Sequence, residues 1–495
     1  MISEQHTVIA AASRWGPGIA LMCWGGAVLG GLAAIPMVLL TDLSPLLLPA
    51  IPLAAVAGIL VLWDTRLGLY LAAFAIGPLN IVQVELAEVT VSFPEVLILA
   101  LFLKELLRFV AGGERPRDFL PWIALGLYVM ASLVGVATGL LRGNGTVKVF
   151  QDFRQFTEYI VLYLLVLHRV SGRRQILGLL VCFMAGFALL GLHGIAQRYT
   201  GLGIPGIQQE SDLVQFGSLR SGSFYGSTPL GAMMVLCLGV TVGVILSIRD
   251  RLIQIILCGV AGVCVIAAVF TQTRASWLAM AVVIVVVFLS IRKTPLLLGA
   301  VFCGLVVFGL TLGGEVVARF SQLRVTKAER SLYQRTQYYE AAWHIFREYP
   351  LRGLGWGCYY NVKSIVRNNR YVPRERPSPK AVATVHSAYL QLLVKGGLLT
   401  LGSLGVYLFT WFMWVAREWR ARPRDELDHN LFVGTMAALL GYLFHSAFEN
   451  FFQWPVMSQA FWLLLALSTL MAVSLVRHGR LDGPLPESDH DAANA

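Results

Sequence analysis

The chain has 495 residues, of which 57% are hydrophobic and only 14% are charged, and its mean hydropathy is +0.68. Soluble domains carry roughly 25% charged residues, so this composition excludes a soluble enzyme, a disordered chain and a collagen-like or disulfide-based scaffold. Apolar runs recur from residue 18 to residue 476. Each run has about 20 residues, which is long enough to cross the hydrocarbon core of a bilayer as a helix. The composition therefore predicts an all-α polytopic membrane protein.

We expect about 12–14 transmembrane helices, because that many apolar segments reach a spanning length. The third and sixth segments are the weakest, and Gly77, Pro78 and Asn80 interrupt the third. The candidate spans are 18–40, 45–63, 67–83, 94–112, 119–141, 149–167, 175–196, 226–247, 252–270, 275–291, 295–312, 387–415, 431–448 and 456–476.

The distribution of lysine and arginine predicts the orientation of these spans. One set of short connections holds 19 basic residues and the opposite set holds 6, so the first set should face the cytoplasm together with both termini. The expected regions are an N-terminal transmembrane bundle of about 11 spans, a large outer loop, a C-terminal group of about 3 spans and a disordered cytoplasmic tail. Their boundaries are 1–313, 314–385, 386–476 and 477–495.

The outer loop 314–385 has a strongly basic composition. It holds 13 basic residues and 5 glutamates, and is the main source of the formal net charge of +11. Such a loop suits an anionic ligand at the membrane surface, whereas nucleic acid is not expected because no nucleic-acid-binding motif is visible. Within the loop, residues 331–348 have helical periodicity, Pro350 should end that helix, and the glycines of the following PLRGLGWG segment favour a tight turn.

Arg220, Arg274 and His386 each lie where a span begins on the outer side. A helix N-terminus presents unpaired N–H groups and a partial positive charge, so two arginines there would bind a phosphate or pyrophosphate bidentately. A histidine at such a terminus is biased toward the neutral form, which accepts a proton as a general base does. The alternative is that the arginines are interface anchors and that the histidine is structural.

Other polar groups in or beside the spans leave similar alternatives open. The cluster of Asp152, Arg154 and Glu158 at the start of the sixth span forms either a structural ion network or part of a substrate cleft. Lys395 either extends toward the interface or pairs with a carboxylate. A group at the outer end of the thirteenth span is expected to anchor the interface. This group is His445, Glu449 and Asn450.

The residues around two of these starts resemble short motifs of a known family. The segment from Arg274 to Leu278 resembles the Arg-x-x-x-Leu motif of bacterial O-antigen ligases, and His386, ten residues and Gly397 resemble their His-x(10)-Gly motif. Residues 331–357 resemble the arginine-bearing helix and PLxGxGxG turn of the same superfamily, which includes Wzy-type O-antigen polymerases and O-linked oligosaccharyltransferases. The resemblance covers roughly residues 210–400. One departure is Ser387, where many relatives carry asparagine.

The spacing of the motifs suggests how they are supported. His386 and Gly397 are about three helical turns apart and should share one helix face, with Gly396 and Gly397 admitting a neighbouring helix. Leu278, four residues after Arg274, should pack inward while the arginine stays at the rim.

The resemblance implies a GT-C-like glycosyltransferase in the bacterial inner membrane, with its active site facing the periplasm. It would move a glycan from undecaprenyl pyrophosphate to an acceptor hydroxyl, with inversion and without a metal or other cofactor. His386 would be the catalytic base, Arg220, Arg274 and Arg335 would bind the pyrophosphate, and Leu278 and Gly397 would support the site.

Several alternatives stay open at this point. The acceptor is a lipid or a growing polysaccharide, which distinguishes a ligase from a polymerase, or it is a protein hydroxyl. A transporter or flippase for the same lipid-linked glycan is the competing class. Transporters often show internal repeats and polar groups near the bilayer midplane, whereas no repeat is visible here and the polar groups lie at helix ends.

Overall fold

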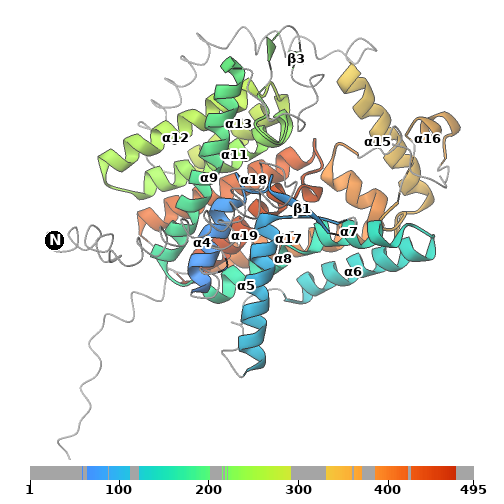
Figure 1. Ribbon diagram of the computed structural model, residues 1–495, viewed down its shortest axis with the longest axis horizontal. Helices are drawn as coiled ribbons and strands as arrows, with labels where there is room; N and C mark the ends of the chain where they lie inside the picture. Colours follow the sequence, from blue (N-terminus) through green and yellow to red (C-terminus); the bar gives the residue numbers. More distant parts are fainter. Residues whose placement is uncertain are drawn as a thin grey trace, which may run out of the picture.

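The computed structural model is built mainly of helices, and Figure 1 shows how they are arranged along the chain. The residues that it describes are 58, 64–86, 89–111, 122–200, 214–215, 218–219, 221–290, 330–358, 360, 362–370, 385–421 and 425–474.

Helices account for nearly all of the regular structure in this part of the chain (Figure 1). Two short antiparallel hairpins, β1 with β2 and β3 with β4, accompany them. The N-terminal helices are α4 (Thr65–Ala75), α5 (Phe93–Val110), α6 (Trp122–Leu141), α7 (Thr146–Thr157), α8 (Ile160–Arg169) and α9 (Arg173–Thr200). The central helices are α11 (Ser227–Ser247), α12 (Arg251–Phe270), α13 (Arg274–Ser290), α15 (Arg330–Glu348) and α16 (Val362–Asn368). The C-terminal helices are α17 (Ala388–Arg420), α18 (Glu426–Ser446), the 3-10 helix η2 (Phe451–Gln453) and α19 (Pro455–Ser474). The strands are β1 (Gln83–Leu86), β2 (Val89–Ser92), β3 (Val214–Gln215) and β4 (Ser218–Leu219).

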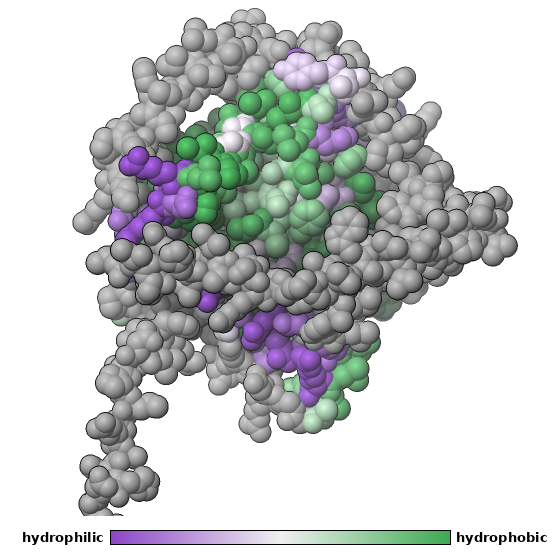
Figure 2. All heavy atoms as spheres, turned by 60° about the vertical axis from the view of Figure 1, so that its left-hand side comes forward, coloured by the Kyte–Doolittle hydropathy of each residue, from purple (hydrophilic) through white to green (hydrophobic). Residues whose placement is uncertain are grey.

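Six of the described helices are long and apolar enough to cross a membrane, namely α6, α9, α11, α12, α17 and α19. α13 is as apolar but shorter. Figure 2 shows a broad hydrophobic face bounded by hydrophilic patches on one side of the molecule, as expected for helices that face lipid. The prediction of an all-α polytopic membrane protein is confirmed.

The two spans that were expected to be the weakest are both interrupted in the structure, the third as its glycine and proline predicted. The third span, 67–83, is interrupted because α4 ends at Ala75, and a hairpin that the sequence analysis did not foresee follows from residue 83. The sixth span, 149–167, is divided into α7 and α8 at Glu158 and Tyr159. The predicted spans 18–40 and 295–312, and 45–63 apart from residue 58, lie outside the described residues.

The centre of the bundle is built by α11 and α18, which pack antiparallel through small residues. Gly243 lies against Gly434, and Gly239 lies against Ala438, so that a side chain at either glycine would meet backbone atoms. Gly441 of α18 then contacts both α11 and α13. Close approach through small residues is the usual way for membrane helices to associate. This packing places the starts of α11 and α13 at the same end of the bundle as the last turn of α18.

The long helix α17 is broken at Gly397, where the backbone has φ 62° and ψ −162°. The segment that follows α15, residues 350–357, fits into this break and is called the cap turn below. The Leu398 N–H donates to the Pro350 carbonyl at 2.8 Å, and the Leu354 N–H donates to the Val394 carbonyl at 2.8 Å. The cap turn therefore takes over backbone hydrogen bonds that a continuous helix would make within itself.

This break corrects the expectation that His386 and Gly397 share one face of a continuous helix. His386 precedes the helix, whose N-cap is Ser387, and the helix then changes direction at Gly397. The close neighbour admitted at Gly397 is the backbone of Leu351 in the cap turn and not another helix.

Trp356 fastens the other half of the cap turn to the bundle. Its indole N–H donates to the Ser132 carbonyl at 2.7 Å, and its ring stacks on Phe156 at a centroid separation of 4.8 Å. Gly135 and Gly139 of α6 leave room for it, since a side chain at either position would overlap Trp356. A large buried aromatic residue with its polar atom satisfied is a strong local anchor.

A buried ion pair completes this connection. Lys395, just before the break in α17, pairs with Asp152 of α7 at 2.6 Å, and Asp152 also accepts the Gly357 N–H at 2.8 Å. Lys148 approaches the same carboxylate at 3.4 Å. Of the two alternatives for Lys395, the structure shows the pair with a carboxylate.

We expect Gly397→Ala to destabilise the protein by about 2 kcal/mol, because a side chain would be strained at this φ. The added Cβ would also lie 2.3 Å from the Leu351 carbonyl oxygen. Thermal unfolding in detergent measures the effect.

The matched control is Gly402→Ala in the same helix, where an added Cβ meets no atom within 4 Å. It should leave the melting temperature unchanged or slightly raised, since alanine favours helix over glycine. Equal melting temperatures for the two variants would contradict the interlocked break.

Candidate active site

His386 directly precedes α17 and is contacted by two tyrosines of α15. Ser387 caps the helix by accepting the Leu390 N–H at 3.4 Å, so the serine supplies the capping oxygen that an asparagine would also supply. Tyr339 of α15 donates its hydroxyl to the His386 carbonyl at 3.1 Å. The ring of Tyr338 lies 5.3 Å from the imidazole, centroid to centroid. The backbone and ring of His386 are therefore fixed by the cap helix.

The imidazole of His386 is hydrogen-bonded to Glu449, which lies just beyond the end of α18. The distance from Nδ1 to Oε1 is 2.8 Å. An ionised carboxylate only accepts hydrogen bonds, so Nδ1 must carry the hydrogen. In the neutral ring this leaves the Nε2 lone pair available to accept a proton. About a third of the side chain is exposed, so a ligand can reach the ring.

Arg335 of α15 fixes the other oxygen of the same carboxylate. Its guanidinium lies 3.3 Å from Oε2 of Glu449 and also donates to the Phe448 carbonyl. Burial raises the pKa of Glu449, but the hydrogen bond from His386 and the positive charge of Arg335 outweigh burial, and the pKa lies below its usual value. The carboxylate is therefore ionised at neutral pH and can hold the Nδ1–H tautomer of His386.

Arg274, the second predicted ligand residue, begins α13 and is partly buried. The packing of Gly441 places this helix start at the same end of the bundle as His386. Arg220 lies outside the described residues, although the segment directly after it is anchored by a hydrogen bond from the Ser221 N–H to the Phe270 carbonyl at 2.9 Å. The structure thus brings His386, Glu449 and Arg335 into direct contact and places Arg274 at their end of the bundle.

The expectation that Leu278 packs inward is wrong. Its side chain is 44% exposed, whereas Ser276 and Ala279 of the same helix are fully buried. Ser276 faces Gly231 of α11, so the inward face of α13 is the small-residue face. Leu278 lies on the side away from this packing, as suits a residue that faces lipid.

Glu449 is the main functional residue that the sequence analysis assigned to another role. The expectation that His445, Glu449 and Asn450 anchor the interface is wrong, because His445 and Asn450 are buried and Glu449 is nearly so. The reason is that η2 folds the chain back directly after α18, under the start of α17, where the Ala388 N–H donates to the Glu449 carbonyl at 3.2 Å. A glutamate at the outer end of a span, on the same side as a candidate base, was the available signal.

The polar cluster at the start of the sixth span separates into two groups. Asp152 belongs to the ion pair with Lys395, whereas Arg154 lies 3.2 Å from Glu158 and 3.5 Å from Glu95 of α5. These contacts favour the structural ion network over the substrate cleft, because they join α5 and α7 and fasten the cap turn.

We expect Glu449→Gln to lower the stability of the protein near neutral pH by about 2 kcal/mol, since it weakens charge-assisted hydrogen bonds to two partners. A carboxylate with a lowered pKa stabilises the fold above its unfolded pKa, and this stabilisation is lost as pH falls through the folded pKa. The difference in melting temperature between the wild type and the variant should therefore shrink below pH 4.5, the ordinary pKa of the group.

Glu340→Gln on the exposed face of α15 is the control and should cause little change at any pH. A difference for Glu449→Gln that stays constant down to pH 3 would contradict the ionised state of Glu449.

Comparison with known families finds one match, which covers part of the site. Residues 259–405 match the family model described as O-antigen ligase. The matched segment runs from α12 to the broken helix α17 and includes Arg274, Arg335, His386 and Gly397. A search of curated proteins found no match. The resemblance seen in the motifs is thus confirmed over this segment: residues 259–405 of this polytopic membrane protein match the O-antigen ligase model, which supports the O-antigen ligase and Wzy superfamily.

Proposed function

We propose that the protein is a glycosyltransferase that moves a glycan from undecaprenyl pyrophosphate to an acceptor hydroxyl at the periplasmic face of the bacterial inner membrane. The observation that carries the proposal is the His386–Glu449 hydrogen bond at 2.8 Å, at a helix start within reach of solvent. The family match supports the same class of reaction. In this proposal both termini face the cytoplasm, as the distribution of basic residues favours.

The proposed reaction is a displacement at the anomeric carbon with inversion. Nε2 of His386 accepts the proton of the acceptor hydroxyl, and the acceptor oxygen forms the new bond to the anomeric carbon. The bond from that carbon to the pyrophosphate oxygen breaks, and undecaprenyl pyrophosphate leaves with the electron pair. Glu449 stabilises the imidazolium that forms, because its carboxylate holds the Nδ1–H throughout.

Arginines would neutralise the leaving pyrophosphate. Arg274 presents its guanidinium at the start of α13, where the helix N-terminus adds a partial positive charge, and we propose Arg220, seven residues before α11, as a second ligand of the pyrophosphate. Arg335 has a more specific place, because it is bound to Glu449 and the Phe448 carbonyl. We propose that it mainly positions Glu449 and adds positive charge to the site.

The acceptor class is resolved best by a deletion strain. Long glycan chains that accumulate on undecaprenyl pyrophosphate, with loss of surface glycan, would identify a ligase for a lipid acceptor. Single repeat units on the acceptor would identify a polymerase, and loss of glycan from proteins alone would identify a protein O-oligosaccharyltransferase. If the protein were a flippase instead, the purified protein would form no new glycosidic product from lipid-linked glycan in detergent.

We expect His386→Ala to reduce transfer by about 10²–10⁴-fold while the protein stays folded, because a general base contributes a factor of this size. A glycan blot of complemented deletion cells and a product assay with purified protein measure the loss. His344→Ala, on the cap helix α15, is the matched control and should retain transfer. Near-normal product from His386→Ala would exclude the proposed base.

We also expect glycan transfer by the wild type to survive EDTA. Transfer by Arg274→Lys should be markedly slower than by the wild type. Lysine keeps the charge but lacks the planar fork that forms two parallel hydrogen bonds to phosphate oxygens. Arg249→Lys, at the opposite end of α11, is the control and should behave as the wild type. Inhibition by EDTA with rescue by magnesium or manganese, or full turnover by both Arg274→Lys and Arg220→Lys, would overturn this account of the leaving group.

A further inference from the structure

A second basic feature lies away from His386, at the junction of α6 and the cap turn. A surface pocket of about 420 Å³ opens there. The residues that line it are Thr138, Leu141, Arg142, Tyr349, Pro350, Leu351, Arg352 and Gly353. Among these described residues both charged side chains are arginines, so the pocket favours an anion.

The two arginines are placed differently in this pocket. The guanidinium of Arg142 lies over the ring of Tyr349, 4.1 Å from its centroid, which fixes the planar group at the end of α6. Arg352 projects from the cap turn between two positions that are held by the break in α17, and it is exposed. One guanidinium that is held in place and a second, exposed one in the same pocket suit the oxygens of a phosphate group.

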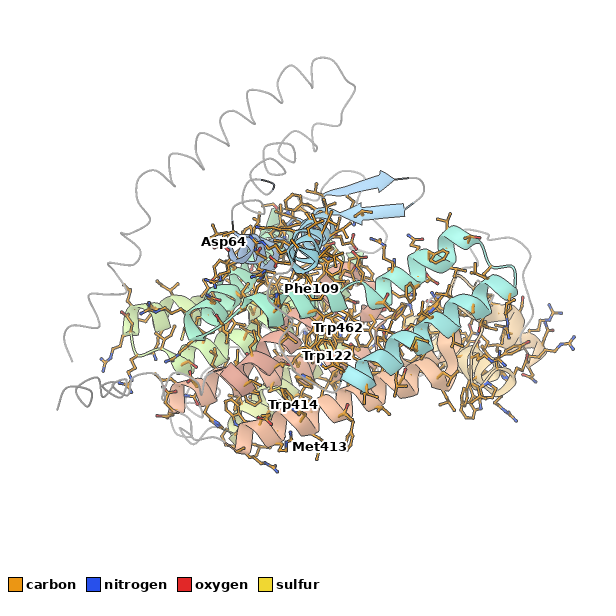
Figure 3. All side chains as sticks on the ribbon, turned by 90° about the horizontal axis from the view of Figure 1, so that it is seen from below. Asp64, Phe109, Trp122, Met413, Trp414 and Trp462 are labelled. Carbon is orange, nitrogen blue, oxygen red and sulfur yellow. The ribbon has the colours of Figure 1, made fainter. Side chains whose placement is uncertain are left out.

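The surface below the pocket is apolar and faces away from the protein. Leu141 is 86% exposed at the last residue of α6, and Leu351 is 60% exposed in the cap turn. Leu398 and Leu399 continue this exposed surface on α17. Helices α6 and α17 lie side by side (Figure 3), and both are long and apolar enough to cross a membrane. Exposed leucines on spanning helices are suited to acyl chains.

The level of the pocket is that of the outer membrane surface in the proposed topology. It lies where α6 ends and the cap begins, and the cap helix α15 contacts Glu449 beside His386. Trp343 of α15 is half exposed, and tryptophan is enriched where a protein surface meets lipid head groups. Arginines at this level, above exposed leucines, are complementary to a ligand with an anionic head group and apolar chains.

We propose that the pocket lined by Arg142, Tyr349 and Arg352 binds the phosphate of an anionic phospholipid, whose acyl chains lie along Leu141, Leu351 and the exposed leucines of α17. This binding is independent of the transfer reaction, because none of its contacts involves His386, Glu449 or Arg274.

Native mass spectrometry of the detergent-purified full-length protein tests this site. We add phosphatidylglycerol or phosphatidylcholine and compare the lipid retained. The wild type should retain phosphatidylglycerol more strongly, and Arg142→Gln with Arg352→Gln should weaken that binding by about tenfold, since each basic residue near a lipid head group adds to its affinity. Arg352→Gln alone leaves the contact of Arg142 with Tyr349 in place and should give a partial loss.

The matched control is Arg367→Gln with Arg370→Gln, which removes the same charge from exposed cap residues outside the pocket. It should retain phosphatidylglycerol as the wild type does, and all variants should melt at the temperature of the wild type without lipid. Three results would overturn the proposal: equal binding of the two lipids by the wild type, an equal loss in the control pair, or soluble glycerol phosphate binding as tightly as phosphatidylglycerol.

Discussion

The hydrogen bonds between the cap turn and the broken helix α17 hold together the parts from which the candidate site is built. Gly397 can adopt a positive φ because it lacks a Cβ, and this frees backbone groups on both sides of the break. Unpaired backbone groups at membrane depth are costly, so the break requires a partner of matching geometry. The cap turn is that partner, and it fixes the cap helix α15 relative to the start of α17. Arg335 and Tyr339 of α15 can then contact Glu449 and His386.

The buried charged residues likewise each have a partner that offsets the cost of removing them from water. Asp152 and Lys395 are both buried and pair with each other, so neither charge is isolated where the cap turn enters the bundle. Glu449 is nearly buried with His386 and Arg335 as partners, and its ionised form determines which nitrogen of the imidazole carries the hydrogen. The pair of Asp152 and Lys395 stabilises the fold, whereas the group of Glu449, His386 and Arg335 fixes the protonation of the imidazole. The same arrangement that stabilises the cap therefore also sets the chemistry of His386.

The sequence was sufficient for the fold class, for most spans in the described part, and for the cap helix, which the structure places at Arg330–Glu348. Hydropathy and proline placement act locally, so they can be recognised without tertiary information. The break at Gly397 was not foreseen, because the glycine pair Gly396 and Gly397 in an apolar helix is compatible with ordinary helix packing. Leu278 was placed on the wrong face, since one spacing of four residues does not identify the buried side of a helix that is apolar all round. Glu449 was misassigned because its partner lies 63 residues away, and only the fold brings them together.

The central claim is that Glu449 holds His386 in the tautomer with its hydrogen on Nδ1. Nitrogen NMR of the full-length protein in detergent, labelled with ¹⁵N-histidine, measures this directly, and the spectrum of His386→Gln identifies the signals that belong to this residue. At a pH where the ring is neutral, the account predicts a protonated Nδ1 and a bare Nε2 that can accept a proton, as the hydrogen bond of 2.8 Å requires. A hydrogen on Nε2 in the neutral ring would contradict it, because His386 could not then take the proton of an acceptor hydroxyl through that nitrogen.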